Sequence, residues 1–141
     1  MSFDLSAINW LPVIVGAIIW FALGALWYSP VLFARPWQRS IGWDPERTPP
    51  QQQVTTYLVP FIGYLVMAIG TAMLAKATGT DTLSEGVVLG LVLGIGFAGA
   101  HTLVDANFDP NKPQPWTWFA ITAVYNAIGL LIVAVLVAIW R

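Results

Sequence analysis

The feature that most constrains the fold is a set of four long apolar segments, at residues 8–28, 54–77, 83–105 and 116–140. A helix needs about 20 apolar residues to cross a hydrocarbon core of roughly 30 Å, and each segment is long enough. Only 9% of the chain is charged, whereas soluble domains carry about a quarter charged residues. We therefore predict one all-α domain over residues 1–141, an integral membrane four-helix bundle.

The third apolar segment carries small residues at every fourth position of the stretch GVVLGLVLGIGFAGAHTLVD. Steps of four residues keep side chains on nearly the same face of a helix, so these positions form a shallow groove. Such grooves let helices approach closely, and we predict packing within the bundle or between protomers. The predicted packing residues of the third and first spans are Gly86, Gly90, Gly94, Ala98, Gly16 and Gly24.

The linker after the first span begins with an amphipathic stretch at residues 30–42. Apolar residues recur every four positions from Phe33 to Ile41, which is typical of a short helix lying in the headgroup region. We expect Ser29 to cap this helix, with Pro30 at its first position. Tryptophan and basic residues mark membrane interfaces. The predicted interfacial anchors are Trp27, Trp37, Trp43, Trp116, Trp118, Arg35 and Arg39.

Polar residues lie near one end of each predicted span. Because consecutive spans are antiparallel, these ends all lie on the side of the membrane that carries the linkers after the first and third spans. Ionisable groups inside a span are costly, and they are candidates for function. His101 and Asp105 are one helical turn apart, so the carboxylate can hold the imidazole in one tautomer. The pair could serve a proton relay, a ligand or a metal, or Asp105 could lie in the headgroups while His101 bonds to the fourth span. The candidate polar cluster comprises His101, Asp105, Thr122, Tyr125, Asn126 and Tyr28.

Several classes of function lack a sequence signal. One histidine without any cysteine is poor material for a metal site, so we predict none. The stretch GLVLGIG lacks the basic residue of a phosphate-binding loop, and no catalytic set of residues is recognisable, so we predict no enzymatic activity. A net charge of −1 argues against electrostatic binding of nucleic acid. No cofactor is predicted, and bound membrane lipid is compatible with such a chain.

The number of spans constrains the topology, because four spans place both termini on one side of the membrane. The linker side carries four basic residues, Arg35, Arg39, Arg47 and Lys112, and the terminal side carries two, Lys76 and Arg141. Basic residues are enriched in cytoplasmic loops. We therefore expect cytoplasmic linkers and termini that face outward.

Both ends of the chain resemble a known family. The opening NWLPVIVGAIIWFALGALWYSPVLFARPW and the final PWTWFAITAVYNAIGLLIVAVLVAIW are similar to the first and last spans of the bacterial family called domain of unknown function 1761. The most specific piece is GALWYSP at residues 24–30. The family often has an asparagine and a histidine in its last span, where this chain has Thr122 and Asn126. The resemblance implies a small four-span protein of the bacterial inner membrane and brings no established activity.

The sequence is compatible with two hypotheses about function. The first is a non-enzymatic accessory or scaffold subunit, packing through small-residue faces in a homo-oligomer or a larger membrane complex. The second is a small oligomeric channel or transporter that uses the polar cluster. A path across the membrane needs polar positions along the whole span. The half of the bundle nearer the two termini offers few polar residues besides Thr71. This asymmetry favours the scaffold.

Overall fold

The computed structural model describes residues 4–48 and 53–140, and every regular element in these residues is a helix. Four helices are long and apolar enough to cross a membrane. They are α1 (Trp10–Trp27), α3 (Val54–Thr78), a continuous rod of α4 (Leu83–Leu91), η2 (Val92–Gly99) and α5 (Ala100–Phe108), and α6 (Pro115–Ile139). The predicted all-α, four-span membrane bundle is therefore confirmed.

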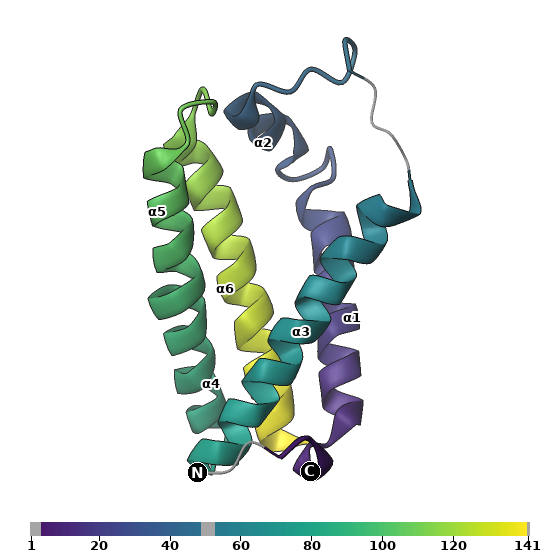
Figure 1. Ribbon diagram of the computed structural model, residues 1–141, viewed down its shortest axis with the longest axis vertical. Helices are drawn as coiled ribbons and strands as arrows, with labels where there is room; N and C mark the ends of the chain where they lie inside the picture. Colours follow the sequence, from purple (N-terminus) through teal and green to yellow (C-terminus); the bar gives the residue numbers. More distant parts are fainter. Residues whose placement is uncertain (1–3, 49–52, 141) are drawn as a thin grey trace.

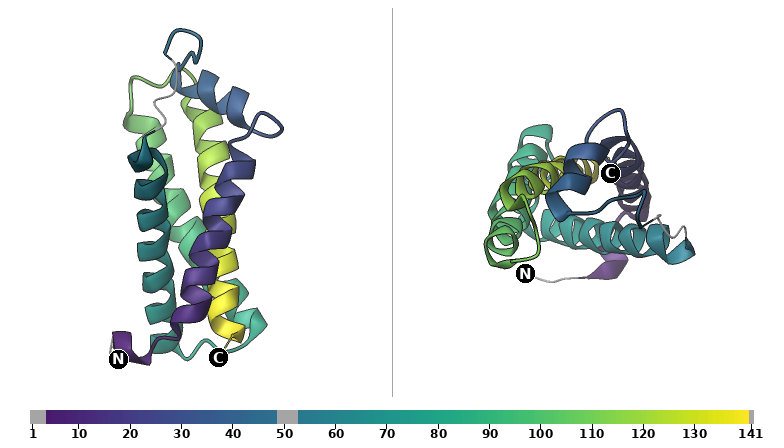
Figure 2. Two further views of the ribbon diagram at one scale, coloured as in Figure 1. Left: turned by 90° about the vertical axis from the view of Figure 1, so that its right-hand side faces the viewer. Right: turned by 90° about the horizontal axis from the view of Figure 1, so that it is seen from above.

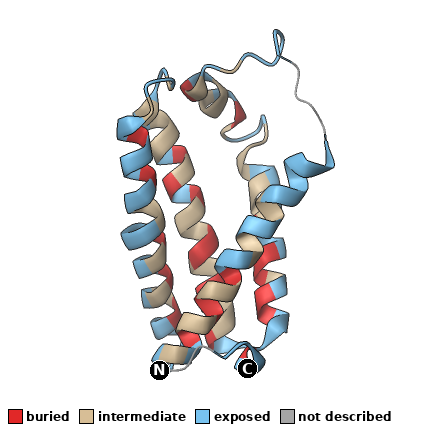
Figure 3. Cartoon of the chain, viewed as in Figure 1, coloured by how far each residue is buried: buried red, intermediate tan, exposed pale blue. Residues whose placement is uncertain are grey.

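Helix α6 is the centre of the bundle. It contacts α1 and α3 on one side and the rod of α4, η2 and α5 on the other (Figure 1). In its most apolar 18-residue stretch, 39% of the residues are buried, against 17% in the third span. Figure 3 shows the buried positions concentrated along α6 and on the faces turned towards it. The third span thus leaves most of its surface open to the bilayer or to a partner.

Different helices and loops lie at the two ends of the bundle. The short helix η1 (Leu5–Ala7) and the end of α6 lie at one end, which we call the terminal side. Helix α2 (Ala34–Ile41) lies across the other end, the linker side, together with the loop between α5 and α6 (Figure 2). Helix η1 and the end of α6 therefore lie at the same end of the bundle.

The start of α2 differs from the sequence prediction. The helix begins at Ala34, and its N-cap residue, Phe33, makes no side-chain capping bond. The Ser29 hydroxyl instead donates to the Leu26 carbonyl at 2.7 Å, so it closes the end of α1. Gly42 ends α2 with a φ of 70°, in the left-handed region that favours glycine.

Local capping residues mark the ends of three of the spans. Thr82 and Glu85 form a capping box at the start of α4, each side chain bonding the backbone of the other. The side-chain oxygen Oδ1 of Asn9 accepts from the Leu11 amide at the start of α1. Gly79 ends α3 with a φ of 69°.

The middle of the third span departs from regular α-helix. Residues Val92–Gly99 form a π-helix, in which the amide of Ala100 reaches the Ile95 carbonyl five residues back. The helix continues through this segment and ends at Phe108, three residues beyond the predicted boundary. Short π segments are frequent at functional sites.

Candidate functional site

The core of the bundle is an inner aromatic cluster of Trp20, Trp27, Tyr28, Tyr64 and Tyr125. Trp20 is fully buried and stacks on Tyr64 with 4.8 Å between ring centroids. The Tyr125 hydroxyl donates to the Trp20 carbonyl oxygen at 3.0 Å. Tyr28 and Trp27 meet the Tyr125 ring at centroid distances of 5.3 and 6.1 Å. These rings fill the space between α1, α3 and α6.

Two glycines make room for this cluster. A Cβ atom added at Gly129 would lie 2.1 Å from Nε1 of Trp20, and one at Gly24 would lie 2.6 Å from the Tyr125 hydroxyl. Trp20 Nε1 and the Thr122 hydroxyl are buried and have no hydrogen-bond partner among the described residues. The position of the Trp20 ring is therefore set by packing on Gly129 rather than by a polar contact of its indole.

His101 and Asp105 lie elsewhere, on the surface of α5. His101 Nε2 is 3.6 Å from the Asp105 carboxylate, and their side chains are 79% and 50% exposed. The buried residues of α5 are Thr102 and Ala106, so these residues face the bundle and the pair faces away from it. Thr102 in turn donates to the Ala98 carbonyl at 2.7 Å within its own helix.

The structure therefore divides the polar cluster that the sequence suggests. Tyr28 and Tyr125 belong to the inner aromatic cluster, and Thr122 and Asn126 are half-buried on α6. His101 and Asp105 are separate from these residues, because the exposed face of α5 points away from α6. Sequence reasoning missed Trp20 and Tyr64 as members of the core cluster, and no local signal marks their pairing across helices.

The glycine groove of the third span faces α6 of the same chain. A Cβ added at Gly90 would lie 2.7 Å from the Leu131 Cα, and one at Gly94 would lie 2.8 Å from the Ala127 Cα. Gly86 is similarly close to α6. Because the conflicting atoms are backbone, they cannot turn aside as a side-chain end can. This groove is used inside the protomer, and self-association remains a prediction that needs another surface.

The remaining packing residues also lie inside the bundle. A Cβ added at Gly16 would lie 3.1 Å from a methyl group of Val133 on α6. Ala98 is half-buried and packs against the hydrophobic core. The first and third spans therefore both place small residues against the central helix.

Three of the predicted anchor tryptophans hold the linker side together. Trp27 Nε1 donates to the Ile121 carbonyl at 3.1 Å. Trp37 and Trp43 pack edge to face at 6.3 Å, and Trp43 Nε1 donates to the Thr48 carbonyl at 3.0 Å. Trp37 also packs on Tyr28 at 5.4 Å between ring centroids, so it connects α2 to the end of α1. The predicted anchors that are exposed are Arg35, Arg39 and Trp116.

A charged contact orders the loop between α5 and α6. Lys112 pairs with Asp109, and its ammonium group lies 4.2 Å from the centre of the Trp118 ring. The hydrogen bonds from Lys112 and from the Asn111 amide lower the pKa of Asp109 below its ordinary value of 3.8. Because the folded pKa is depressed, this contribution to stability is complete above pH 3.8 and is lost as the pH falls through the lowered value.

Metal-binding geometry is lacking in the residues described. No group of three His, Cys, Asp or Glu side chains within residues 4–48 and 53–140 is placed to hold a metal ion.

The chain was compared with models of protein families, with curated proteins and with solved structures. A family model described as "Protein of unknown function (DUF1761)" matches residues 11–138. Neither the curated proteins nor the solved structures gave a match. The matched region includes the linkers and all four spans except the first residue of α1 and the last residue of α6. The chain therefore belongs to the DUF1761 family of proteins of unknown function.

Proposed function

We propose that this protein is a non-enzymatic structural subunit that associates laterally in the membrane through the outer face of its third span. The observation that carries this proposal is the His101–Asp105 pair, which lies on an exposed surface of a membrane helix. Ionisable groups in spans normally face a protein interior or a water-filled cavity. The outer face comprises the exposed residues Gly96, Phe97, Ala100, His101, Val104 and Asp105.

The depth of the pair supports this proposal. The third span has 26 residues, which corresponds to about 39 Å of helix. If the span is centred on a hydrocarbon core of roughly 30 Å, Asp105 lies near its boundary and His101 lies about one turn inside it. Lipid offers His101 no polar partner at that depth, whereas a neighbouring protein surface can.

A second copy of this chain is the partner that we infer. In a two-fold pair both subunits present the same patch, so His101 of one copy can meet Asp105 of the other. Gly96 allows the close approach that this requires, because a Cβ added there meets no atom within 4 Å. Small residues at an open position are typical of helix contacts in membranes. The face thus offers both a hydrogen-bonding pair and an open small residue to a second copy.

An oligomeric channel or transporter is the second candidate. The inner aromatic cluster occupies the interior of the protomer, so a polar path would have to run between copies. His101 and Asp105 would lie near such a path. This candidate predicts that their removal abolishes solute flux while the assembly itself persists.

Replacement of both members of the pair tests the proposal. We expect His101→Leu combined with Asp105→Leu to weaken self-association about tenfold, measured by energy transfer between labelled copies in vesicles. Two symmetric polar contacts at the average of about 0.6 kcal/mol each sum to about 1.2 kcal/mol, which is close to that factor because 1.4 kcal/mol is tenfold. The fold should persist because both side chains are exposed.

A second exposed ion pair provides the matched control. Asp44 and Arg47 lie 3.5 Å apart in the linker outside the spans, and their replacement by leucine should leave association unchanged. Association that survives the loss of His101 and Asp105 would contradict the proposed contact. Equal weakening by the control pair would show that general surface charge, rather than this face, drives association.

A further inference from the structure

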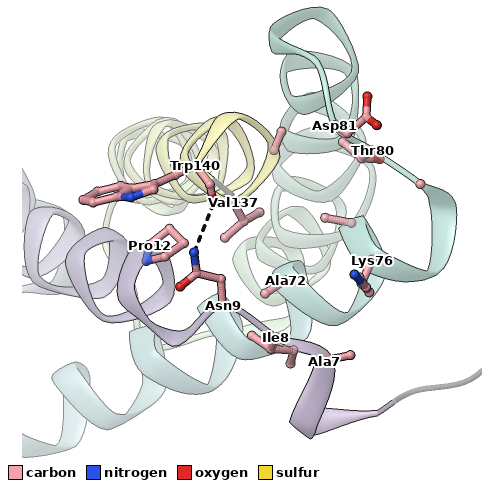
Figure 4. Close-up of a pocket in the computed structure, with 13 residues that line it drawn as sticks. Ala7, Ile8, Asn9, Pro12, Ala72, Lys76, Thr80, Asp81, Val137 and Trp140 are labelled. Carbon is pink, nitrogen blue, oxygen red and sulfur yellow. Dashed lines mark hydrogen bonds between the residues drawn. The ribbon is translucent and has the colours of Figure 1, made fainter.

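A cavity of about 420 Å³ opens at the terminal side, between the start of α1, the end of α3 and the end of α6 (Figure 4). Its size falls within the range of roughly 300–1,000 Å³ that small-molecule sites occupy. It is separate from the outer face of the third span, which lies on α5 and η2. The proposed lateral association therefore makes no use of it.

The floor and the rim of this cavity differ in chemistry. Pro12, Ala72 and Val137 contribute apolar surface, and Pro12 and Ala72 are buried. Asn9 and Lys76 contribute polar groups from the two sides of the cavity (Figure 4). A pocket with an apolar floor and a polar rim suits an amphiphile better than a free polar solute.

The polar groups of the rim suit a phosphate diester. Lys76 is exposed in the last turn of α3, where its ammonium group can serve as a point charge for phosphate. One N–H of the Asn9 amide donates to the Trp140 carbonyl at 3.4 Å. Because an amide nitrogen carries two N–H groups, the second can donate to a ligand oxygen.

The net charge of the residues that line the cavity indicates which phosphate-containing headgroup the cavity suits. Lys76 and Asp81 are the charged residues that line the cavity, so their formal charges cancel. A neutral lining disfavours an anionic headgroup and suits one that carries both a phosphate and an ammonium group. The cavity also lies at the end of the spans, beside the half-exposed Trp140, at the level where bilayer headgroups are found.

We propose that this cavity binds the headgroup of a zwitterionic membrane phospholipid, with its phosphate at Lys76 and Asn9 and its acyl chains towards the apolar floor. The same phosphate chemistry is present in a water-soluble glycerophosphate ester, which lacks the chains. The apolar floor distinguishes the two sources, because only the lipid can use it.

Native mass spectrometry of the detergent-solubilised protein tests this site. With phosphatidylethanolamine added, we expect one tightly bound lipid on the wild-type chain and at least a tenfold loss of its occupancy in Lys76→Gln. The variant should fold because Lys76 is exposed. Arg39→Gln, an exposed basic residue on the opposite side of the bundle, is the matched control and should retain the lipid.

Two competition arms identify the ligand. Glycerophosphoethanolamine without acyl chains should fail to displace the bound lipid, and phosphatidylglycerol, which is anionic, should compete at least tenfold more weakly than phosphatidylethanolamine. Undiminished lipid binding by Lys76→Gln would overturn the proposal. Full displacement by the soluble headgroup at equal concentration would do so too, since it would show a phosphate site without a lipid contribution.

Discussion

The Gly129→Ala substitution is expected to lower the free energy of unfolding by about 3 kcal/mol, the upper part of the range for overpacked cores. The added Cβ would lie 2.1 Å from the indole of Trp20, which is fully buried and surrounded by other rings. The indole cannot move without displacing Tyr64 and Tyr125, which pack against it. Tryptophan fluorescence during titration of the detergent-solubilised protein with sodium dodecyl sulfate measures the loss.

A second glycine in a membrane span provides the control. A Cβ added at Gly63 on α3 meets no atom within 4 Å, so Gly63→Ala should leave stability unchanged or slightly improved. Both substitutions exchange the same residues within long helices and therefore share the same change in helix propensity. Equal stability of Gly129→Ala and Gly63→Ala would contradict the packing described for Trp20.

The second large effect is expected for Gly90→Leu, which should prevent the third span from packing on α6. Its Cβ alone would lie 2.7 Å from the Leu131 Cα, and the rest of the leucine side chain has no space. We expect loss of the monodisperse, helical protein in size-exclusion chromatography and circular dichroism. Because the obstacle is backbone, a rotamer change cannot relieve it.

Gly96→Leu separates folding from association. Gly96 lies only six residues further along the same span, but a Cβ there meets no atom within 4 Å. This variant should fold normally and associate more weakly, because the leucine would occupy the outer face. Normal folding of Gly90→Leu would show that the glycine groove does not face α6. Unchanged association of Gly96→Leu would count against the outer face as the contact.

The sequence alone predicts those parts of the structure that depend on nearby residues. Apolar length determines the four spans, and capping chemistry marks the starts of α1 at Asn9 and of α4 at Thr82. Gly79 marks the end of α3 because its φ of 69° favours glycine. The start of α2 was predicted wrongly because Ser29 bonds back to Leu26 in α1 instead of forward.

The parts that could not be predicted depend on contacts between distant residues. His101 and Tyr125 lie in adjacent helices, but the rotation of α5 about its axis turns His101 away from α6, and spacing alone does not fix that rotation. The π segment before α5 adds to the difficulty, because it changes the residues per turn. Likewise, nothing near Trp20 in the sequence indicates that its ring packs on Gly129.

Cysteine cross-linking in native membranes tests the proposed association most directly. The chain contains no cysteine, so each single-cysteine variant reports one position. A disulfide forms only where the two Cα atoms approach within about 7 Å. We predict that Ala100→Cys, beside His101 on the outer face, yields a disulfide-linked dimer on oxidation, whereas Val66→Cys, exposed on α3, does not. A dimer through Val66 without one through Ala100, or none at either position, would contradict association through this face.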